Sequence, residues 1–358
     1  MHILMGETSL AVVAKKCRAE TVRRRLAALG ILRTSMRVFS DDEYVYFPVE
    51  RPPNPDELPE LITGDAKVQE AIFNKLALKP KTLKEAMMGV LDKELIELVP
   101  RSFDIIGNVA ILELDERLRP FAKDIASALK LVHKHVDTVL LKAGPSTGEY
   151  RTRPYEVIAG SGNTLTEHRE HGCRYRLDVR EVFFTPRLSG ERLRVASQVR
   201  PNECVADMFA GVGPFSITIA KMQPSCKVYA FEINPMAYKF LEENIKLNKV
   251  EGRVTAIFGD VRHNYVVLEK KADRLIMNLP FSAEKYLDVA TKLAKPSGAI
   301  VHFYGATEDE NAIETVKANV SSIIQSLGFD SKFLWAKELK EVAPRKVVVA
   351  LDIAICMR

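Results

Sequence analysis

Residues 207–215 read Asp-Met-Phe-Ala-Gly-Val-Gly-Pro-Phe, and this stretch decides the fold. The apolar residues that enter it predict a buried strand, and the pattern over 216–222 predicts a helix. Between them lie Gly211 and Gly213, which lack a Cβ and so let a ligand approach the backbone closely. Because open α/β sheets bind ligands at the carboxyl ends of their strands, we expect this turn to form the floor of a cofactor site.

Two glycines in this spacing are a weak signal by themselves, because many α/β domains use glycine at such a turn for packing alone. The residues around them disfavour a dinucleotide. Ser216 stands where the dinucleotide-binding fingerprint has its third glycine, and Asp207 would put an acid near the pyrophosphate.

Polar side chains follow the next three predicted strands. Glu232 ends the second strand about 20 residues after the glycine turn, where an acid can accept both hydroxyls of a ribose. Asp260 follows the third strand, where it could meet an adenine amino group, and Asn278 follows the fourth, just before Pro280. Each alone is commonly a helix cap or a turn residue. Together, at one sheet edge, they predict a site for an adenosine-containing ligand.

Strand and helix signals alternate from residue 195 onward, which indicates a doubly wound, mostly parallel α/β sheet with helices on both faces. The last two predicted strands, 333–339 and 346–356, lie too close for a crossover helix and are expected to pair antiparallel. The other expected strands are 204–207, 227–232, 254–258, 274–278 and 299–304, and the expected helices are 214–222, 235–247, 283–294 and 308–326.

Two smaller α+β domains are expected before this sheet, so that the chain divides into 1–62, 63–173 and 174–358. The first would hold a helix over 9–30 that ends at Gly30, strands near 38–39 and 44–49, and a proline-rich linker over 51–63. The second would hold helices at 67–76, 82–88 and 120–133, a loop at 143–148, and strands at 103–114, 136–141, 157–160 and 165–168.

Charge is unevenly distributed along the chain. The net charge is +5, but residues 1–40 hold eight Lys and Arg against two Glu, so this segment carries +6 and the rest is near neutral. Such asymmetry suggests a polyanionic partner, although most charge runs are solvated helix faces.

Composition excludes several classes of protein. No apolar run is long enough to cross a membrane and no export signal is visible, so we expect a cytoplasmic protein without a membrane partner. Five scattered cysteines without a C-x-x-C pair indicate buried, reduced thiols rather than a zinc site. His2, His168, His171 and His263 also lack metal-ligand spacing. Nothing demands a dimer, and we expect a monomer.

A basic block precedes the sheet, with Arg187, Glu191, Arg192 and Arg194 inside Phe-Phe-Thr-Pro-Arg-Leu-Ser-Gly-Glu-Arg-Leu-Arg at 183–194. Arginine can bind a carboxylate or a phosphate through two hydrogen bonds. A glutamate among arginines stays ionised and can accept a proton. The alternative is a surface helix in which Glu191 forms salt bridges with Arg187 or Arg194.

The stretches at 207–215, 229–235 (Tyr-Ala-Phe-Glu-Ile-Asn-Pro), 259–260 (Gly-Asp) and 277–280 (Met-Asn-Leu-Pro) resemble the motifs of class I S-adenosylmethionine-dependent methyltransferases. With the 183–194 block and Gly-Glu-Tyr-Arg-Thr-Arg at 148–153, nearly the whole chain resembles the archaeal and eukaryotic tRNA (guanine-37-N1)-methyltransferases, the Trm5 family. The resemblance implies methyl transfer from S-adenosylmethionine to N1 of guanosine 37. It also implies contacts with the tRNA anticodon loop and, through the N-terminal domain, with the outer corner of the tRNA.

Guanine N1 carries a proton, so its methylation needs a base for that proton and a donor for the charge that grows on O6. By resemblance, Glu191 is the base, Arg151 stabilises O6, and Asn278 and Pro280 line the guanine pocket. Phe183 stands where some members of the family carry tyrosine, and we assign it no polar role. The residues expected around the cofactor are Arg187, Arg192, Phe209, Gly211, Gly213, Glu232, Ile233, Asp260, Val261 and Asn278.

Three other functions stay open. One is a wyosine-pathway enzyme that methylates a tricyclic guanosine derivative, alone or as a second activity. Another is transfer of the aminocarboxypropyl group of the same cofactor. The Met-Asn-Leu-Pro motif, which methylating members carry, argues against it. The third is a non-catalytic tRNA-binding module, which the set of Glu191, Asn278 and the cofactor acids disfavours. An amino-group methyltransferase is disfavoured because the fourth-strand motif is Asn-Leu-Pro-Phe, not Asn-Pro-Pro-Tyr.

Overall fold

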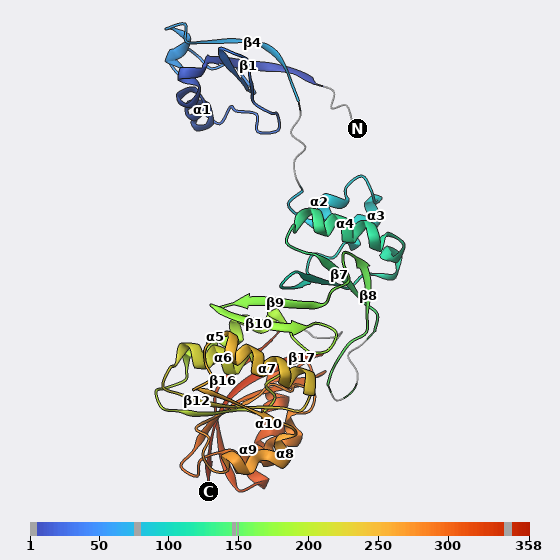
Figure 1. Ribbon diagram of the computed structural model, residues 1–358, viewed down its shortest axis with the longest axis vertical. Coiled ribbons are helices and arrows are strands. Elements are labelled where there is room, and N and C mark those ends of the chain that lie inside the picture. The colour runs from blue at the N-terminus through green and yellow to red at the C-terminus, as the bar shows by residue number, and fades with distance from the viewer. Residues whose placement is uncertain (1–5, 75–79, 145–147, 149, 340–345) are drawn as a thin grey trace. The chain divides into compact units, whose positions relative to one another are not determined.

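The structure is a computed structural model that describes residues 6–74, 80–144, 148, 150–339 and 346–358 (Figure 1). The chain divides into two compact units, Met1–Lys81 and Thr82–Arg358. Part of the predicted loop at 143–148, and His2, lie outside the described residues. No helix among those residues is long and apolar enough to cross a membrane.

The first unit is an antiparallel sheet of four strands in the order β2-β3-β1-β4, with one helix. Its elements are β1 (Glu7–Lys15), α1 (Ala19–Ala28), β2 (Phe39–Ser40), β3 (Tyr44–Pro48) and β4 (Ala66–Phe73). Val22 and Leu26 of α1 are buried against the sheet, and Gly30 follows the helix at φ +67°, as its predicted role as a cap requires.

Two helix predictions in this unit were wrong. Residues 9–15, expected in a helix, lie in β1, and 67–76 was expected as a helix where β4 lies. Val12 and Ala14 pack with α1, whereas Ala11 and Val13 pack with Met36 on the other face. Because both faces of β1 are covered, its apolar run is continuous and gives no period that separates strand from helix.

The predicted linker at 51–63 and the boundary at 62/63 were also wrong. Leu58 is fully buried, and the carboxylate of Glu60 forms an ion pair with Arg25 of α1. Strand β4, which follows the predicted boundary, pairs with β1 along its length. The prolines therefore shape a packed loop, and this unit extends to Lys81.

The second unit begins with a four-stranded sheet in the order β5-β6-β7-β8 and a helical layer. The elements are α2 (Leu83–Met87), α3 (Lys93–Leu98), β5 (Asp104–Ile106), β6 (Val109–Leu112), the 3-10 helix Glu116–Phe121, α4 (Ala122–Val132), β7 (Thr138–Lys142) and β8 (Tyr155–Ala159). The helix predicted at 120–133 thus starts as a 3-10 turn, and the strands predicted around Gly107 are confirmed.

A hairpin of β9 (Leu165–Glu170) and β10 (Cys173–Asp178) follows, and the predicted boundary at 173/174 was wrong because it cuts this hairpin. The amides of Asn244 and Asn248 pair with the backbone of Arg176 and Arg174. Side-chain amides thus take the place of a neighbouring strand and attach the hairpin to the helix Pro235–Leu247, which packs on the larger sheet.

The predicted doubly wound α/β domain is confirmed. Its seven strands run in the order β13-β12-β11-β14-β15-β17-β16. The strands are β11 (Cys204–Asp207), β12 (Lys227–Glu232), β13 (Val254–Phe258), β14 (Arg274–Met277), β15 (Ala299–Thr307), β16 (Phe329–Glu338) and β17 (Val347–Met357). The first five are parallel, and β17 pairs antiparallel with β16, as predicted, and also with β15.

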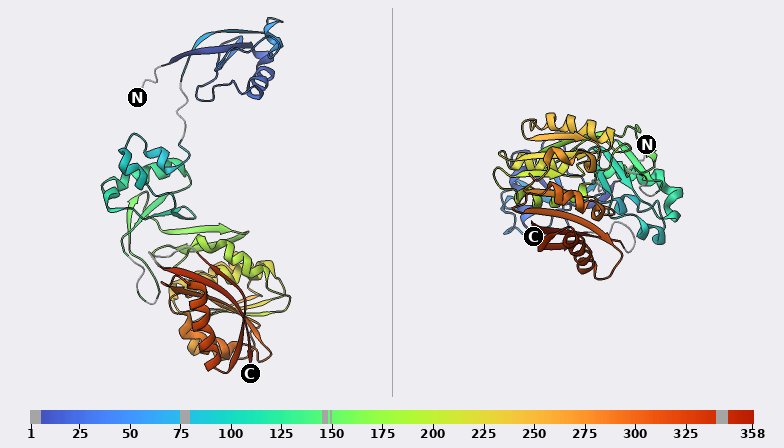
Figure 2. Two further views of the ribbon diagram at one scale, coloured as in Figure 1. Left: turned by 180° about the vertical axis from the view of Figure 1, so that it is seen from behind. Right: turned by 90° about the horizontal axis from the view of Figure 1, so that it is seen from below.

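Helices cover both faces of this sheet (Figures 1 and 2). One face carries α5 (Ser189–Ser197), α6 (Pro214–Met222) and α7 (Pro235–Leu247). The other carries α8 (Val261–Asn264), α9 (Leu287–Leu293) and α10 (Ala312–Ser326). The sequence did not predict α8, and α10 starts four residues later than expected. The expectation of buried thiols fails for Cys17 and Cys356, which are exposed.

Candidate active site

The two glycines of the turn between β11 and α6 serve different ends. Gly213 has φ +91°, and a Cβ there would lie 2.6 Å from Leu241 Cδ1, so this glycine lets α6 pack against α7. Gly211 has φ +57°, and the nearest atom to a Cβ there would be the carbonyl oxygen of Phe183, 3.9 Å away. The backbone at Gly211 is therefore open to a ligand.

Glu232 lies beside this open backbone, as predicted. The Gly211 N–H donates to Oε2 of Glu232 at 2.7 Å, and the Asn234 N–H donates to Oε1 at 2.7 Å. Burial raises the pKa of Glu232 above its usual value. The half-buried Ile233 follows directly. The second strand thus places a carboxylate at the glycine turn.

Asp207 does not face a ligand, although the sequence placed it on the turn. Its side chain is buried and accepts a hydrogen bond of 2.7 Å from the Ser216 hydroxyl. Burial raises the pKa of Asp207 to about 6. Ser216, at the position of the missing third glycine, therefore ties the start of α6 to the end of β11 through a buried hydrogen bond.

Asp260 is the N-cap of α8 and accepts a hydrogen bond from the Arg262 N–H at 2.8 Å. Burial favours a higher pKa for Asp260, but hydrogen bonds and charge from Arg262 outweigh it and lower the pKa. The Arg262 guanidinium lies 4.9 Å from the ring centroid of Tyr286, whose ring meets that of Phe209 edge-on at 4.9 Å. This chain of contacts links the end of β13 to the glycine turn. Val261, which follows Asp260, is buried.

The loop after β14 meets Arg151. Asn278 and Pro280 are half-buried, and Phe281 is half-exposed. The Arg151 guanidinium lies 5.1 Å from the centroid of the Phe281 ring. Burial lowers the pKa of Arg151. The structure therefore brings Arg151 to Phe281, in the loop that also holds Asn278 and Pro280, more than a hundred residues away in the chain.

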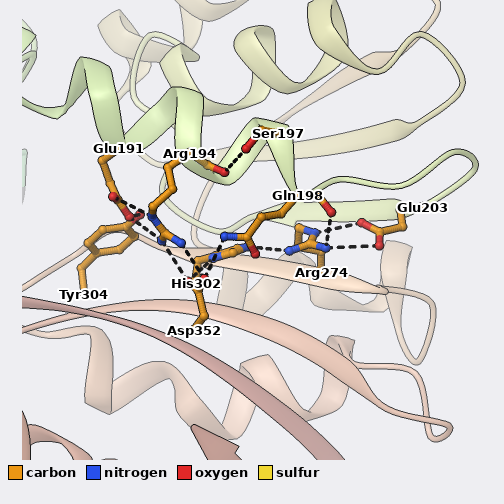
Figure 3. Close-up of polar contacts among 9 residues, drawn as sticks. All are labelled: Glu191, Arg194, Ser197, Gln198, Glu203, Arg274, His302, Tyr304 and Asp352. Carbon is orange, nitrogen blue, oxygen red and sulfur yellow. Dashed lines mark hydrogen bonds and ion pairs between the residues drawn. The ribbon is translucent and has the colours of Figure 1, made fainter. Parts of the chain in front are cut away.

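Glu191 is in the first turn of α5, and its side chain is buried (Figure 3). Arg194 donates to both carboxylate oxygens, with Nε at 2.9 Å from Oε2 and Nη2 at 2.6 Å from Oε1. The Tyr304 hydroxyl donates to Oε1 at 2.8 Å. The pairing with Arg194 that the alternative interpretation foresaw is real, but it lies inside the protein and not on a surface helix.

Arg187 and Arg192 were expected at the cofactor, and the structure gives both other partners. Arg187 is exposed, and its Nε donates to Asp104 of β5 at 2.7 Å. Arg192 is 2% exposed, binds both carboxylate oxygens of Glu170, and donates to the Thr185 carbonyl at 2.6 Å. Arg192 thus anchors the segment 183–185, whose Phe183 carbonyl oxygen lies near Gly211, and so supports the glycine turn indirectly. The spacing of the basic block could not reveal these distant partners.

Sequence reasoning missed Tyr304, which binds Glu191, Asp352, which binds Arg194, and His302, which binds Asp352 (Figure 3). All three are buried on β15 and β17. The available signal was a polar residue within an apolar strand, as in Val-His-Phe-Tyr at 301–304 and Leu-Asp-Ile at 351–353. Within the described part of the chain, no cluster of three His, Cys, Asp or Glu residues could hold a metal ion.

Comparison with protein families divides the chain into three matched segments. Residues 13–57 match the tRNA methyltransferase 5 N-terminal domain, 83–164 the TYW2 N-terminal domain, and 166–330 the TRM5/TYW2 methyltransferase domain. The last match begins at β9, in agreement with the attachment of the hairpin to the larger sheet.

Three curated relatives carry names of tRNA-modifying enzymes. The tRNA (guanine(37)-N(1))-methyltransferase Trm5b of Pyrococcus abyssi is 39% identical, over 97% of this chain and 99% of its own length. The tRNA(Phe) (4-demethylwyosine(37)-C(7)) aminocarboxypropyltransferase of Pyrococcus horikoshii is 36% identical over 78% of this chain and 97% of its own. The tRNA 4-demethylwyosine(37)-methyltransferase Taw21 of Saccharolobus solfataricus is 33% identical over 71% and 93%.

Two solved structures of similar proteins also cover most of the chain. The complex of aTrm5 and tRNALeu is 32% identical, covers 96% of this chain and 99% of that chain, and has a TM-score of 0.77. Methanocaldococcus jannaschii TYW2 in complex with AdoMet is 28% identical over 72% of this chain and 100% of that chain, with a TM-score of 0.56. The sheet order, the open glycine turn and these full-length similarities lead to one conclusion: the chain belongs to the Trm5/TYW2 methyltransferase family.

Proposed function

We propose that this protein transfers the methyl group of S-adenosylmethionine to N1 of guanosine 37 in the tRNA anticodon loop. The observation that carries this proposal is the extent of similarity. The Trm5b relative aligns with 97% of the chain, including the N-terminal unit, whereas the two wyosine-pathway relatives align with 78% and 71%. Residues 13–57 match the tRNA methyltransferase 5 N-terminal domain specifically.

The residues at the glycine turn fit S-adenosylmethionine. When bound, this cofactor supplies an electrophilic methyl group on a positively charged sulfur. Gly211 offers open backbone, and Glu232 offers carboxylate oxygens suited to two ribose hydroxyls. In this proposal Asp260 and the backbone of Val261 bind the adenine, which is consistent with their place at the start of α8. Phe209, which contacts Tyr286, lines the same site.

Glu191 accepts the guanine N1 proton, because a protonated N1 has no lone pair for the methyl carbon. Arg151 donates hydrogen bonds to O6 as negative charge develops there. Asn278 and Pro280 line the guanine pocket, with the Asn278 amide able to contact N2 or the cofactor. Held by Gly211 and Glu232, the cofactor would supply its methyl group to N1. The proton leaves on Glu191.

The N-terminal unit contacts the outer corner of the tRNA in this proposal. Its charge alone is a modest argument, because residues 1–81 hold 13 Lys and Arg against 11 Asp and Glu. Glu20 pairs with Arg23 and Arg24, and Asp65 pairs with Lys15. The match to the tRNA methyltransferase 5 N-terminal domain supports the assignment better than charge does. A monomeric state and a cytoplasmic location stay predictions from the sequence.

The test is mass spectrometry of nucleosides from unmodified tRNA after incubation with the protein and S-adenosylmethionine. N1-methylguanosine is expected from tRNA carrying G37 and not from a control with A37. The wyosine relatives justify a parallel reaction on tRNA that carries the tricyclic precursor. A product from the tricyclic precursor alone, or a heavier aminocarboxypropyl adduct, would overturn the proposal and assign the enzyme to the wyosine pathway.

A further inference from the structure

Glu191 belongs to a chain of polar contacts that runs from Tyr304 on β15 to Glu203, just before β11 (Figure 3). Arg194 binds Glu191 and also both carboxylate oxygens of Asp352, at 2.6 and 2.9 Å. Asp352 accepts further hydrogen bonds from His302 Nδ1 at 2.6 Å and from the Gln198 amide at 2.9 Å. The chain therefore joins α5 to β15 and β17 at the position of the proposed base.

The tautomer of His302 follows from its two partners. Arg274 can only donate, and its Nη1 lies 2.7 Å from His302 Nε2, so Nε2 carries the lone pair. His302 Nδ1 then carries the proton and donates it to Asp352. Burial lowers the pKa of His302, which agrees with a neutral ring. The charge of Arg274 is balanced at the far end by Glu203, at 2.8 Å.

Arg194 is thus shared by two carboxylates. Burial would raise the pKa of Asp352, but hydrogen bonds from His302 and Arg194 outweigh it and hold the pKa well below its usual range. Asp352 therefore stays ionised and continues to accept hydrogen bonds from Arg194. A glutamate that had a buried arginine to itself would be a poor proton acceptor, because the pair stabilises the ionised form. Sharing leaves one cation for two anions, Glu191 and Asp352.

The three hydrogen bonds to Glu191 are divided unequally. Among the described residues, Oε1 accepts from Tyr304 and Arg194, whereas Oε2 accepts only from Arg194 Nε. Oε2 therefore has the larger unused acceptor capacity. Tyr304 lies on β15, directly after Phe303, whose backbone pairs with Met277 at the end of β14, one residue before Asn278. The Tyr304 hydroxyl and Arg194 thus fix which oxygen can take a proton.

We propose that Tyr304 and Arg194, with Asp352 dividing the charge of Arg194, position Glu191 so that its Oε2 accepts the guanine N1 proton. This inference rests on the proposed function and concerns positioning residues that do not touch the substrate. The groups that face Glu191 from the packed elements are Arg194 on α5, Tyr304 on β15 and, through Arg194, Asp352 on β17 and Trp335 on β16, whose ring lies 3.8 Å from the guanidinium.

The variant Tyr304→Phe tests the inference, because it removes the hydroxyl and keeps the ring. Single-turnover methylation of G37-tRNA is measured from pH 5 to 9 at saturating enzyme. The rate at pH 8 is expected to fall about tenfold, with cofactor and tRNA affinities within about threefold of wild type. The acid limb of the pH–rate profile is expected to move to higher pH, because a donor that stabilised the carboxylate is gone.

The matched control is Tyr175→Phe. Tyr175 is also fully buried in this unit, and its hydroxyl bonds to Thr218 at 2.9 Å and not to any member of the contact chain. The control is expected to lower thermal stability and leave the pH profile unchanged. A second variant, Arg194→Lys, replaces the fork that spans both carboxylates by a single ammonium and is expected to lower the rate at least as much.

The outcomes separate the two proposals. Wild-type protein that makes no N1-methylguanosine would overturn the proposed function and this inference together. If the wild type is active and Tyr304→Phe has the same rate and pH profile, the inference alone is overturned. It is also overturned if Tyr175→Phe shifts the pH profile as much as Tyr304→Phe does. A lower melting temperature without a change in the pH profile would show that Tyr304 is only structural.

Discussion

The edge formed by Gly211, Glu232 and Asp260 and the cluster around Glu191 belong to one sheet but are built differently. At the glycine edge, the two carboxylates accept hydrogen bonds from backbone N–H groups of the turns at that edge. The Gly211 N–H donates to Glu232, and the Arg262 N–H donates to Asp260. At Glu191, the partners come from α5, β15 and β17. A short motif can describe the first site. The second needs the folded sheet, because its chemistry depends on how distant residues share charge.

The largest expected effect tests the Glu191 cluster. Glu191→Gln removes the proton acceptor, so the single-turnover rate should fall about 1,000-fold, or about 4 kcal/mol in the barrier. Affinities for tRNA and cofactor should stay nearly intact. Glu203→Gln is the control, since Glu203 binds Arg274 beyond the part of the chain that holds Glu191. A Glu191→Gln rate within about threefold of wild type would remove this residue from the role of base.

Two alanine substitutions sharpen the comparison at the glycine edge. Gly213→Ala should lower the free energy of unfolding by about 3 kcal/mol, because φ is +91° and the new methyl group would collide with Leu241. Gly211→Ala meets open space, so it should lower that free energy by only about 1 kcal/mol while weakening cofactor binding. Urea unfolding and calorimetric titration measure both. Equal loss of stability in the two variants would contradict their separate roles.

Asp207 predicts a pH dependence of stability. Its pKa is raised from 3.8 to about 6, so the folded state binds the proton more tightly. Its contribution is fully present below about pH 4 and is lost as pH rises through 6, a change of about 3 kcal/mol in the free energy of unfolding. Asp207→Asn should lack this change. The stability difference between wild type and variant is measured by urea unfolding from pH 4 to 7.5, and a constant difference would refute the assignment.

A smaller effect than that of Glu191→Gln is expected at Glu232. Glu232→Gln keeps the shape but offers one acceptor oxygen instead of two, so cofactor affinity should fall about 30-fold, or about 2 kcal/mol. The rate at saturating cofactor should change much less, in contrast to Glu191→Gln. Cofactor titration followed by single-turnover assays separates the two effects. A variant with normal affinity and a slow saturated rate would mean that Glu232 serves the reaction and not the ribose.

The N-terminal unit shows where sequence patterns fail. Its central strand β1 is covered on both faces, so its apolar run resembles a helix start, and the prolines at 52–55 resemble a linker. Burial of Leu58 and the pairing of β4 with β1 could not be inferred locally, because these contacts join residues far apart in the chain. The parallel sheet was predicted more accurately because short apolar strands alternate there with helices, and this alternation itself indicates the fold.

The sequence by itself determined the doubly wound sheet, the open glycine turn and the acids at successive strand ends. These features depend on local backbone conformation and on the rule that parallel strands end at one edge. Only the tertiary structure decided that Asp207 turns inward, that Arg192 is bound to Glu170, and that Glu191 shares Arg194 with Asp352. Those outcomes are set by burial and by partners on distant strands, and neither can be read from a motif.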